Sequence, residues 1–265
     1  MFKLLILFLL STNILSAFGY ESAVNRMMSM NSLFKETNTV VHSSSFKKTN
    51  TKMVNRSLSD RSFQNKIFNS ASCNKTLSNK VLKSCYSYKF KGPKIVSYTL
   101  NGNLVNQVNL RKRGYWKVNK SIPFKYRGNS DDYIGYDRCH LAFDSAFDYN
   151  RRILQNTYDV NINSVPMLAK VNRYTWIKAE SHAKDIAYRL GKVLVTDVIV
   201  YGRSPKRIGR NRIAVPKGFY KIIRNQNKSY EKCFYYENKI TRNYNSDTLW
   251  SHVVDCKKAI NSARY

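Results

Sequence analysis

The chain of 265 residues is long enough for one domain of ordinary size with an N-terminal extension, or for two small domains. Hydrophobic residues make up 43% of it and aromatic residues 13%, so it can build a substantial core and is not disordered throughout. Its formal net charge of +30 attracts polyanions, which include nucleic acids, anionic lipid head groups and acidic glycans. The charge argues against a protein that must avoid nucleic acid.

Residues 1–19 are typical of a secretory signal peptide. Lys3 supplies the positive charge, an apolar stretch begins at Leu4, and the small residues Ala17 and Gly19 fit a cleavage site. The stretch is short for a hydrocarbon layer about 30 Å thick, so we expect cleavage, with a retained N-terminal anchor as the alternative. We therefore expect an exported protein, periplasmic or extracellular, whose mature chain has no stable membrane span.

Residues 20–72 are predicted to form a basic, disordered arm rich in Ser and Asn. Ser, Thr and Asn account for 22 of its 53 residues, which leaves few apolar side chains for a core. Aromatic and β-branched residues become dense from Cys73 onward. We therefore place the folded domain at 73–258 and a short C-terminal tail at 259–265.

Hydrophobic alternation and turn residues predict the elements of this domain. In chain order we expect a hairpin, a short strand, a helix and four further strands. Their ranges are 94–100 and 103–110 for the hairpin, 133–141 for the short strand, 171–190 for the helix, and 193–201, 213–215, 219–223 and 233–236 for the later strands. Asn101-Gly102 supplies the hairpin turn, and Gly191 ends the helix. Strands mixed with a helix, without regular β-α-β alternation, indicate an α+β fold.

The five cysteines are compatible with disulfides in an exported protein. By spacing, Cys73 with Cys85 and Cys233 with Cys256 are the natural local pairs, although four cysteines allow three connectivities. Cys139 remains unpaired in this scheme.

The expected helix carries Asn172, Trp176 and Glu180 at intervals of four residues. At about 100° per residue the three lie on one side of the helix. That side would present an amide oxygen and a carboxylate two turns apart. From the helix alone, an ordinary amphipathic helix with Trp176 in the core is the alternative.

Three motifs follow one another along the chain. They are Asp137-Arg138-Cys139-His140, Asn163-Ser164-Val165-Pro166-Met167, and Asn172 through Trp176 to Glu180. Their order and spacing resemble those of the DNA/RNA non-specific endonuclease family, the ββα-metal (His-Me finger) nucleases related to the Serratia extracellular nuclease, in its bacterial exported branch. The likeness runs from about Cys73 to Cys256. It implies an α+β domain with a ββα-metal core and a mixed or antiparallel sheet.

The resemblance implies a Mg²⁺-dependent endonuclease that hydrolyses phosphodiester bonds of DNA and RNA, with Mn²⁺ as a substitute cation. His140 would be the general base and Asn172 the direct protein ligand of the cation. Glu180 would hold water in the outer shell of the cation, Asn163 would orient the site, and Arg138 would bind phosphate. A neutral imidazole can take a proton from water near working pH, and Mg²⁺ tolerates a coordination shell made mostly of water and phosphate.

The family also uses an upstream arginine against the phosphate. Arg113 is the first candidate for it and Arg127 the second, and Arg173 is a further candidate for substrate binding. Among the basic runs, Arg111–Arg113 and Arg203–Arg212, we expect one to follow the phosphate backbone. Such contacts carry little base information, which suits cleavage without sequence preference.

The chain departs from the family pattern at three positions. Cys139 stands where the family has Gly, Met167 where it has Gln, and Phe143 where it usually has Pro. If the position of Cys139 needs φ > 0, a side chain there costs about 1–2 kcal/mol, and otherwise the thiol could obstruct the substrate. The alternative function is therefore a catalytically impaired, exported relative that binds nucleic acid or another polyanion. A redox-sensitive thiol beside Arg138 is a second reading of Cys139, against a buried inert thiol.

Overall fold

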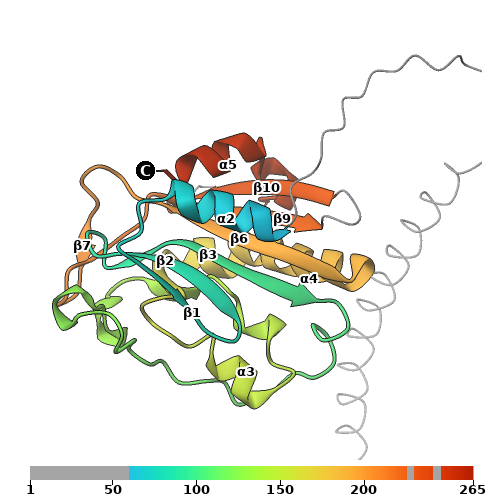
Figure 1. Ribbon diagram of the computed structural model, residues 1–265, viewed down its shortest axis with the longest axis horizontal. Helices are drawn as coiled ribbons and strands as arrows, with labels where there is room; N and C mark the ends of the chain where they lie inside the picture. The colour runs from blue at the N-terminus through green and yellow to red at the C-terminus, as the bar shows by residue number, and fades with distance from the viewer. Residues whose placement is uncertain (1–59, 226–229, 241–245, 265) are drawn as a thin grey trace, which may run out of the picture. The chain divides into compact units, whose positions relative to one another are not determined.

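The computed structural model describes residues 60–225, 230–240 and 246–264. A seven-stranded antiparallel sheet forms its centre, in the order β1-β2-β3-β6-β9-β10-β11 (Figure 1). The strands are β1 (Lys75–Ser78), β2 (Leu82–Ser87), β3 (Gly92–Asn101), β6 (Lys192–Val200), β9 (Gly218–Asn225), β10 (Tyr230–Glu237) and β11 (Val253–Val254). The expected signal peptide at 1–19 and the first part of the expected arm lie outside the described residues.

Helices cover both faces of the sheet, which gives three layers (Figure 1). Helices α2 (Asp60–Ser70) and α5 (Cys256–Ser262) pack on one face, and α4 (Ile177–Leu190) packs on the other. Successive strand residues point to opposite faces, so Leu194 packs with α2 and α5 while Val195 packs with α4. Because both faces are buried, these strands read as continuous apolar runs in the sequence.

The shorter elements lie mainly between β3 and β6 and after β6. Among them are two small antiparallel pairs, β4 with β5 and β7 with β8. The ranges are η1 (Phe124–Tyr126), η2 (Ser130–Asp132), β4 (Asp137–His140), η3 (Asp144–Ala146), α3 (Arg151–Gln155), β5 (Ser164–Met167), the π-helical segment η4 (Val171–Trp176), β7 (Arg207–Ile208), β8 (Ile213–Ala214) and η6 (Leu249–His252). Among the residues described, no helix is long and apolar enough to cross a membrane.

The structure confirms the α+β class and most later elements. Strands β6, β8, β9 and β10 coincide with the four predicted ranges, and the chain is helical over the predicted 171–190. Gly191 ends the helix with φ 91°, a conformation that favours glycine. The predicted strand at 133–141 is shortened to β4.

The predicted hairpin across Asn101-Gly102 is wrong. The strand at 94–100 exists as part of β3, but residues 103–110 form turns and loop instead of a second strand. Strand β3 pairs with β2 along one edge and with β6 along the other, so neither edge is left for residues 103–110. The Gly102 amide instead donates to the Gly191 carbonyl at 2.7 Å.

Both predicted limits of the folded domain also require correction. Helix α2 lies inside the predicted arm, yet Phe63, Ile67 and Phe68 are buried in the core beneath it. Helix α5 runs into the predicted tail and buries Ala259 and Ala263. The amphipathic pattern of α2 is short and surrounded by polar residues, which is why composition alone assigned it to the arm.

The structure confirms the two local disulfide pairs. Cys73 bonds to Cys85, which ties the segment after α2 to β2, and Cys233 bonds to Cys256, which ties β10 to the start of α5. Cys139 is free and buried.

The contribution of α2 to stability can be tested by substitution. We expect Ile67→Ala to lower the free energy of unfolding by about 2–5 kcal/mol, because it leaves a cavity in the core between α2 and the sheet. Urea unfolding followed by fluorescence measures the change. Lys66→Ala, at an exposed position of the same helix, is the matched control and should change it by less than about 0.5 kcal/mol. Equal stability of the Ile67→Ala protein would place α2 outside the folded unit.

Candidate functional site

A β4–β5–helix unit holds the residues that the sequence motifs single out. Strands β4 and β5 pair antiparallel, with His140 opposite Ser164, and the chain then enters η4 and α4. Together they enclose a cavity of about 220 Å³. Its walls are Arg138, His140, Phe143, Asp144, Asn172, Arg173, Ile177 and Glu180. The structure thus brings five of the predicted site residues into one cavity.

Asn163 lies beneath the cavity and holds the backbone that follows His140. It is fully buried, and its amide makes three hydrogen bonds. Its Oδ1 accepts from the Ala142 amide at 2.7 Å, and its Nδ2 donates to the carbonyls of Ala142 at 2.9 Å and Thr157 at 2.7 Å. The geometry therefore assigns Asn163 to positioning, since it does not line the cavity.

Asp137 fixes the orientation of Asn172. The Asn172 Nδ2 donates to the Asp137 carboxylate at 3.0 Å, which leaves the Asn172 Oδ1 as the end of the amide available to a cation. Arg173 binds the same carboxylate through two hydrogen bonds of 2.7 and 2.8 Å. Partial burial opposes the charge of Asp137, but the bonds from Arg173 and Asn172 outweigh it and lower its pKa.

The helix start differs from the regular α-helix that the spacing predicts. Residues Val171–Trp176 are π-helical, and only then does α4 begin. Asn172 and Glu180 both line the cavity, as predicted, but Trp176 is fully buried and packs against Phe219 and Tyr236. Trp176 therefore serves the core, as the alternative of an ordinary amphipathic helix expects, while Asn172 and Glu180 serve the cavity.

Glu180 lies at the inner wall of the cavity, above a buried ion pair. Burial raises the pKa of its carboxyl to about 8, while Lys221 opposes the shift and Asp197 adds to it. Lys221 is itself fully buried and donates to Asp197 at 2.7 Å and to the Tyr98 hydroxyl at 3.0 Å. A cation entering the cavity would favour the ionised carboxylate of Glu180.

Aromatic rings enclose the imidazole of His140. Trp116 stacks on it at a centroid distance of 4.4 Å, and Tyr158 meets it edge-on at 4.5 Å. Its Nε2 is buried without a hydrogen-bond partner among the described residues. Burial lowers the pKa of His140 to about 4; Asp144 opposes this shift, and the charges of Arg113 and Arg138 add to it. The ring is therefore neutral at neutral pH.

The three predicted phosphate-binding arginines upstream of the helix have different surroundings. Arg138 is exposed at the cavity wall and lies over Trp116 at 5.8 Å. Arg113 does not line the cavity. Its Nε lies 3.9 Å from the carboxylate of Asp144, which does, and its Nη1 binds the carboxylate of Asp148 at 3.0 Å. Arg127 does not line the cavity, because its guanidinium donates to backbone carbonyls of its own loop, at Ile122 and Lys120.

Cys139 does not obstruct the cavity. It is 1% exposed, packs in the core on the α4 side of the sheet, and pairs with Val165 of β5. Within the described residues only Lys91 and Arg212 combine a side chain with positive φ, so Cys139 causes no left-handed strain. Burial raises the pKa of its thiol, which contradicts the reactive-thiolate reading. Met167 is likewise fully buried.

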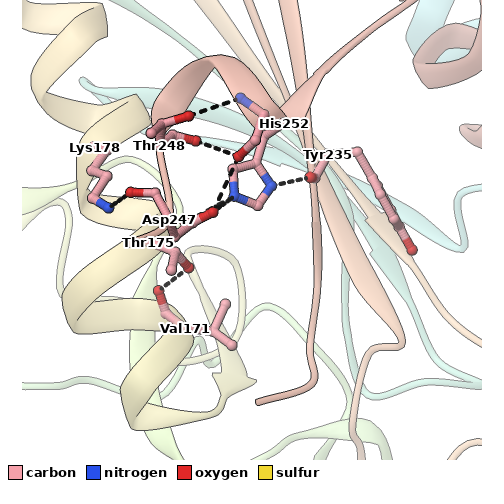
Figure 2. A network of polar contacts seen from close by, with 8 residues as sticks. Val171, Thr175, Lys178, Tyr235, Asp247, Thr248 and His252 are labelled. Carbon is pink, nitrogen blue, oxygen red and sulfur yellow. Dashed lines mark hydrogen bonds and ion pairs between the residues drawn. The ribbon is translucent and has the colours of Figure 1, made fainter. Parts of the chain in front are cut away.

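A second polar network, shown in Figure 2, braces the helix that carries Asn172 and Glu180. Lys178 of α4 donates to the backbone carbonyl of Asp247. The Asp247 carboxylate is 2.7 and 2.9 Å from Nε2 of His252, whose Nδ1 lies 2.9 Å from the Tyr235 carbonyl. The helix is thus tied to β10 and to the chain around η6.

The donors in the cavity fit a hard, largely hydrated cation. They offer one amide oxygen, from Asn172, and two carboxylates, from Glu180 and from Asp144, the latter bound to the Tyr158 hydroxyl, with space beside them for water. In residues 60–225, 230–240 and 246–264 no three His, Cys, Asp or Glu side chains cluster as a metal cage would need. A cation held here would rely on water and substrate for most of its ligands.

Sequence reasoning missed four side chains that shape the site. Asp137 stands within the first motif, and its role could have been inferred from that position. Asp144, Trp116 and Tyr158 carry no local signal, because only the tertiary fold places them around His140. The Tyr158 hydroxyl donates to Asp144 at 2.5 Å, so that carboxylate faces the site in a fixed position.

Comparisons with known proteins identify the family and a similar fold. Residues 59–261 match the model of the family described as DNA/RNA non-specific endonuclease. The chain is 26% identical over 158 residues to the mitochondrial nuclease of Saccharomyces cerevisiae, covering 53% of this chain and 47% of that protein, so it spans about half the length of this relative. The fold resembles the crystal structure of the EndoG/EndoGI complex, with a TM-score of 0.66, 21% identity, and coverage of 77% of this chain and 91% of that one.

The enclosure of His140 predicts an unusual titration. We expect its ring to titrate at about pH 4 in NMR spectra of the protein without added metal, and Trp116→Ala to move the value toward the 6.5 of an exposed histidine by admitting water. Trp250→Ala is the matched control, because Trp250 is exposed and contacts His182 instead. In the unfolded chain His140 has its ordinary pKa of 6.5, so as pH falls from 6.5 to 4 the unfolded chain binds a proton that the folded protein does not. The free energy of unfolding therefore decreases over this pH range. Titration near pH 6.5 in the unsubstituted protein would contradict the enclosure.

Proposed function

Because the chain belongs to the DNA/RNA non-specific endonuclease family, we propose that it is an exported, Mg²⁺-dependent endonuclease that hydrolyses phosphodiester bonds of DNA and RNA. One observation carries the proposal. A single cavity holds an imidazole kept neutral by burial, an amide oxygen aimed by a carboxylate, and a second carboxylate. Hydrolysis needs a group that accepts a proton from water and a positive field around the phosphate.

His140 acts as the general base in this proposal. Its lowered pKa keeps the ring unprotonated and able to accept the proton as the water oxygen bonds to phosphorus. A base with a pKa near 4 is weak, but the negative charge of a bound phosphodiester raises that pKa toward neutrality. Trp116 and Tyr158 hold the ring in one orientation, so the base needs no reorganisation.

Asn172 would hold the Mg²⁺ directly, and Glu180 would hold its water. When bound, the cation supplies Lewis-acid stabilisation of the charge that develops on the phosphate and on the leaving oxygen, and Mn²⁺ can substitute for it. Asp137 aims the Asn172 amide, and Lys221 keeps a positive charge beneath Glu180. Arg138 is the arginine best placed to bind the phosphate, with Arg113 held behind Asp144.

The proposal includes export to the periplasm or the extracellular space. The signal-like sequence at 1–19 supports it, as do the two disulfides, which persist in oxidising compartments. The impaired-binder alternative rests on Cys139 and Met167. The burial of the Cys139 thiol in the core removes the obstruction that the alternative required, and Met167 is buried as well, so neither side chain lines the cavity.

Substitution of the proposed base tests the enzyme. We expect His140→Ala to lower the rate of plasmid and RNA cleavage in Mg²⁺ by about 10²–10⁴-fold, because the water loses its proton acceptor. Asn172→Ala should lose activity and require more Mg²⁺, and EDTA should abolish cleavage by the unsubstituted protein. His182→Ala is the control, since His182 binds Tyr230 outside the cavity, and it should retain activity. DNA that is retarded but intact in Mg²⁺ with the unsubstituted protein would favour the binder.

Restoring glycine at position 139 tests the remaining alternative. Because the thiol points into the core, we expect Cys139→Gly to leave the cleavage rate unchanged within about twofold. The substitution should lower the free energy of unfolding by about 1–3 kcal/mol, through the lost packing and the added chain entropy. A tenfold or greater gain in cleavage rate would show that the natural residue impairs the enzyme.

A further inference from the structure

The run Arg203–Arg212, together with β8, folds into a compact hairpin of its own, which we call the basic hairpin (residues 203–214). Strands β7 and β8 form it, and four of its cations are exposed: Arg203, Lys206, Arg210 and Arg212. The sequence has no Asp or Glu between Asp197 and Glu231. In the part of the chain that the structure describes, none of these four cations forms an ion pair.

The basic hairpin is docked rigidly on the segment that leads into β4. The Asp132 carboxylate, 1% exposed, accepts from the backbone amide and the side chain of Asn211, both at 2.8 Å. Gly209 has φ 67° and lies so close that a Cβ there would be 2.3 Å from the Asp132 Cα. Ile208 and Ile213 are buried in a common cluster with Tyr133. The hairpin is therefore held on Asp132, which lies five residues before the start of β4, the strand that carries His140.

A second, shallow cavity lies beside the site, in the segment on which the basic hairpin is docked. It has a volume of about 320 Å³ and is lined by residues between Ser130 and Arg138. Arg138 lines both this cavity and the site cavity. At another wall stands Tyr136, with the Lys206 Nζ 5.5 Å from its ring centre. A chain of nucleotides leaving the site past Arg138 would therefore meet Lys206 next.

We propose that the basic hairpin binds the phosphates of the nucleotides next to the one being cleaved, so that Arg138, the second cavity and Lys206 form one path for the polynucleotide. This inference rests on the proposed function of the site. Exposed, unpaired cations on a rigid support bind a polyanion without losing an existing partner, and release its counterions on binding. The contacts are to phosphate, so they add affinity without base preference.

The hairpin's composition favours nucleic acid over an anionic membrane surface. A segment that binds lipid head groups commonly adds apolar side chains that enter the bilayer. The isoleucine and alanine side chains of the basic hairpin, Ile208, Ile213 and Ala214, are all buried.

The test measures affinity for DNA in the His140→Ala background, so that the substrate survives. Lys206→Gln with Arg210→Gln should weaken binding of a 20-base-pair duplex and lower the slope of log Kd against log salt by about 1 for each lost phosphate contact. The matched control is Lys257→Gln with Lys258→Gln, which removes the same charge from exposed positions of α5. Helix α5 packs on the face of the sheet opposite to α4, which carries Glu180.

An unchanged slope in the hairpin variant would overturn the inference, as would an equal loss of affinity in the control variant, which would reflect net charge alone. A hairpin variant that loses binding to vesicles of anionic phospholipid but keeps its affinity for DNA would also overturn it, in favour of a membrane surface. Because Kd is measured without turnover, failure of the unsubstituted protein to cleave would count against the proposed function and not against the hairpin.

Discussion

The buried amide of Asn163 is the constraint on which the geometry of the site depends. It connects three backbone groups, two in the segment after His140 and one in the segment before β5, in a place that water does not reach. Loss of any of these bonds would leave a buried polar group unpaired, at a cost of about 1–3 kcal/mol. The connection supports the pairing of β4 with β5 at its His140 end, next to Ser164, and thus the position of the imidazole.

Two carboxylates at the cavity, Asp137 and Asp144, each lie near an arginine, and each orients different side chains. Asp137 uses its charge to orient Asn172 and Arg173. Asp144 faces His140 while it is held by Tyr158 and lies near Arg113. These carboxylates accept hydrogen bonds from the side chains around the cavity and so hold those side chains in one orientation. The resulting site combines a neutral base with a cationic rim, which suits an anionic substrate.

The sequence predicted the later strands and the helix well, because long apolar or periodic runs ended by glycine are strong local signals. It failed at β3, where the Asn-Gly turn suggested a hairpin, since a turn signal does not show which strands will occupy the two edges. It failed at α2, whose few apolar residues find partners only in a sheet built from distant segments. It also missed the π-helical segment, because spacing by four fits an α-helix equally well.

By itself, the sequence determined the three motifs, the family likeness, the local cysteine pairs and the excess of positive charge, because composition, order and spacing can be counted along the chain without knowledge of the fold. Only the tertiary structure decided that Cys139 points into the core, that Arg127 is bound to its own loop, and that Trp116 and Tyr158 enclose His140. It also decided that the basic hairpin docks on the segment that leads into β4. The direction and partners of a side chain depend on packing between segments far apart in sequence, which local pattern does not encode.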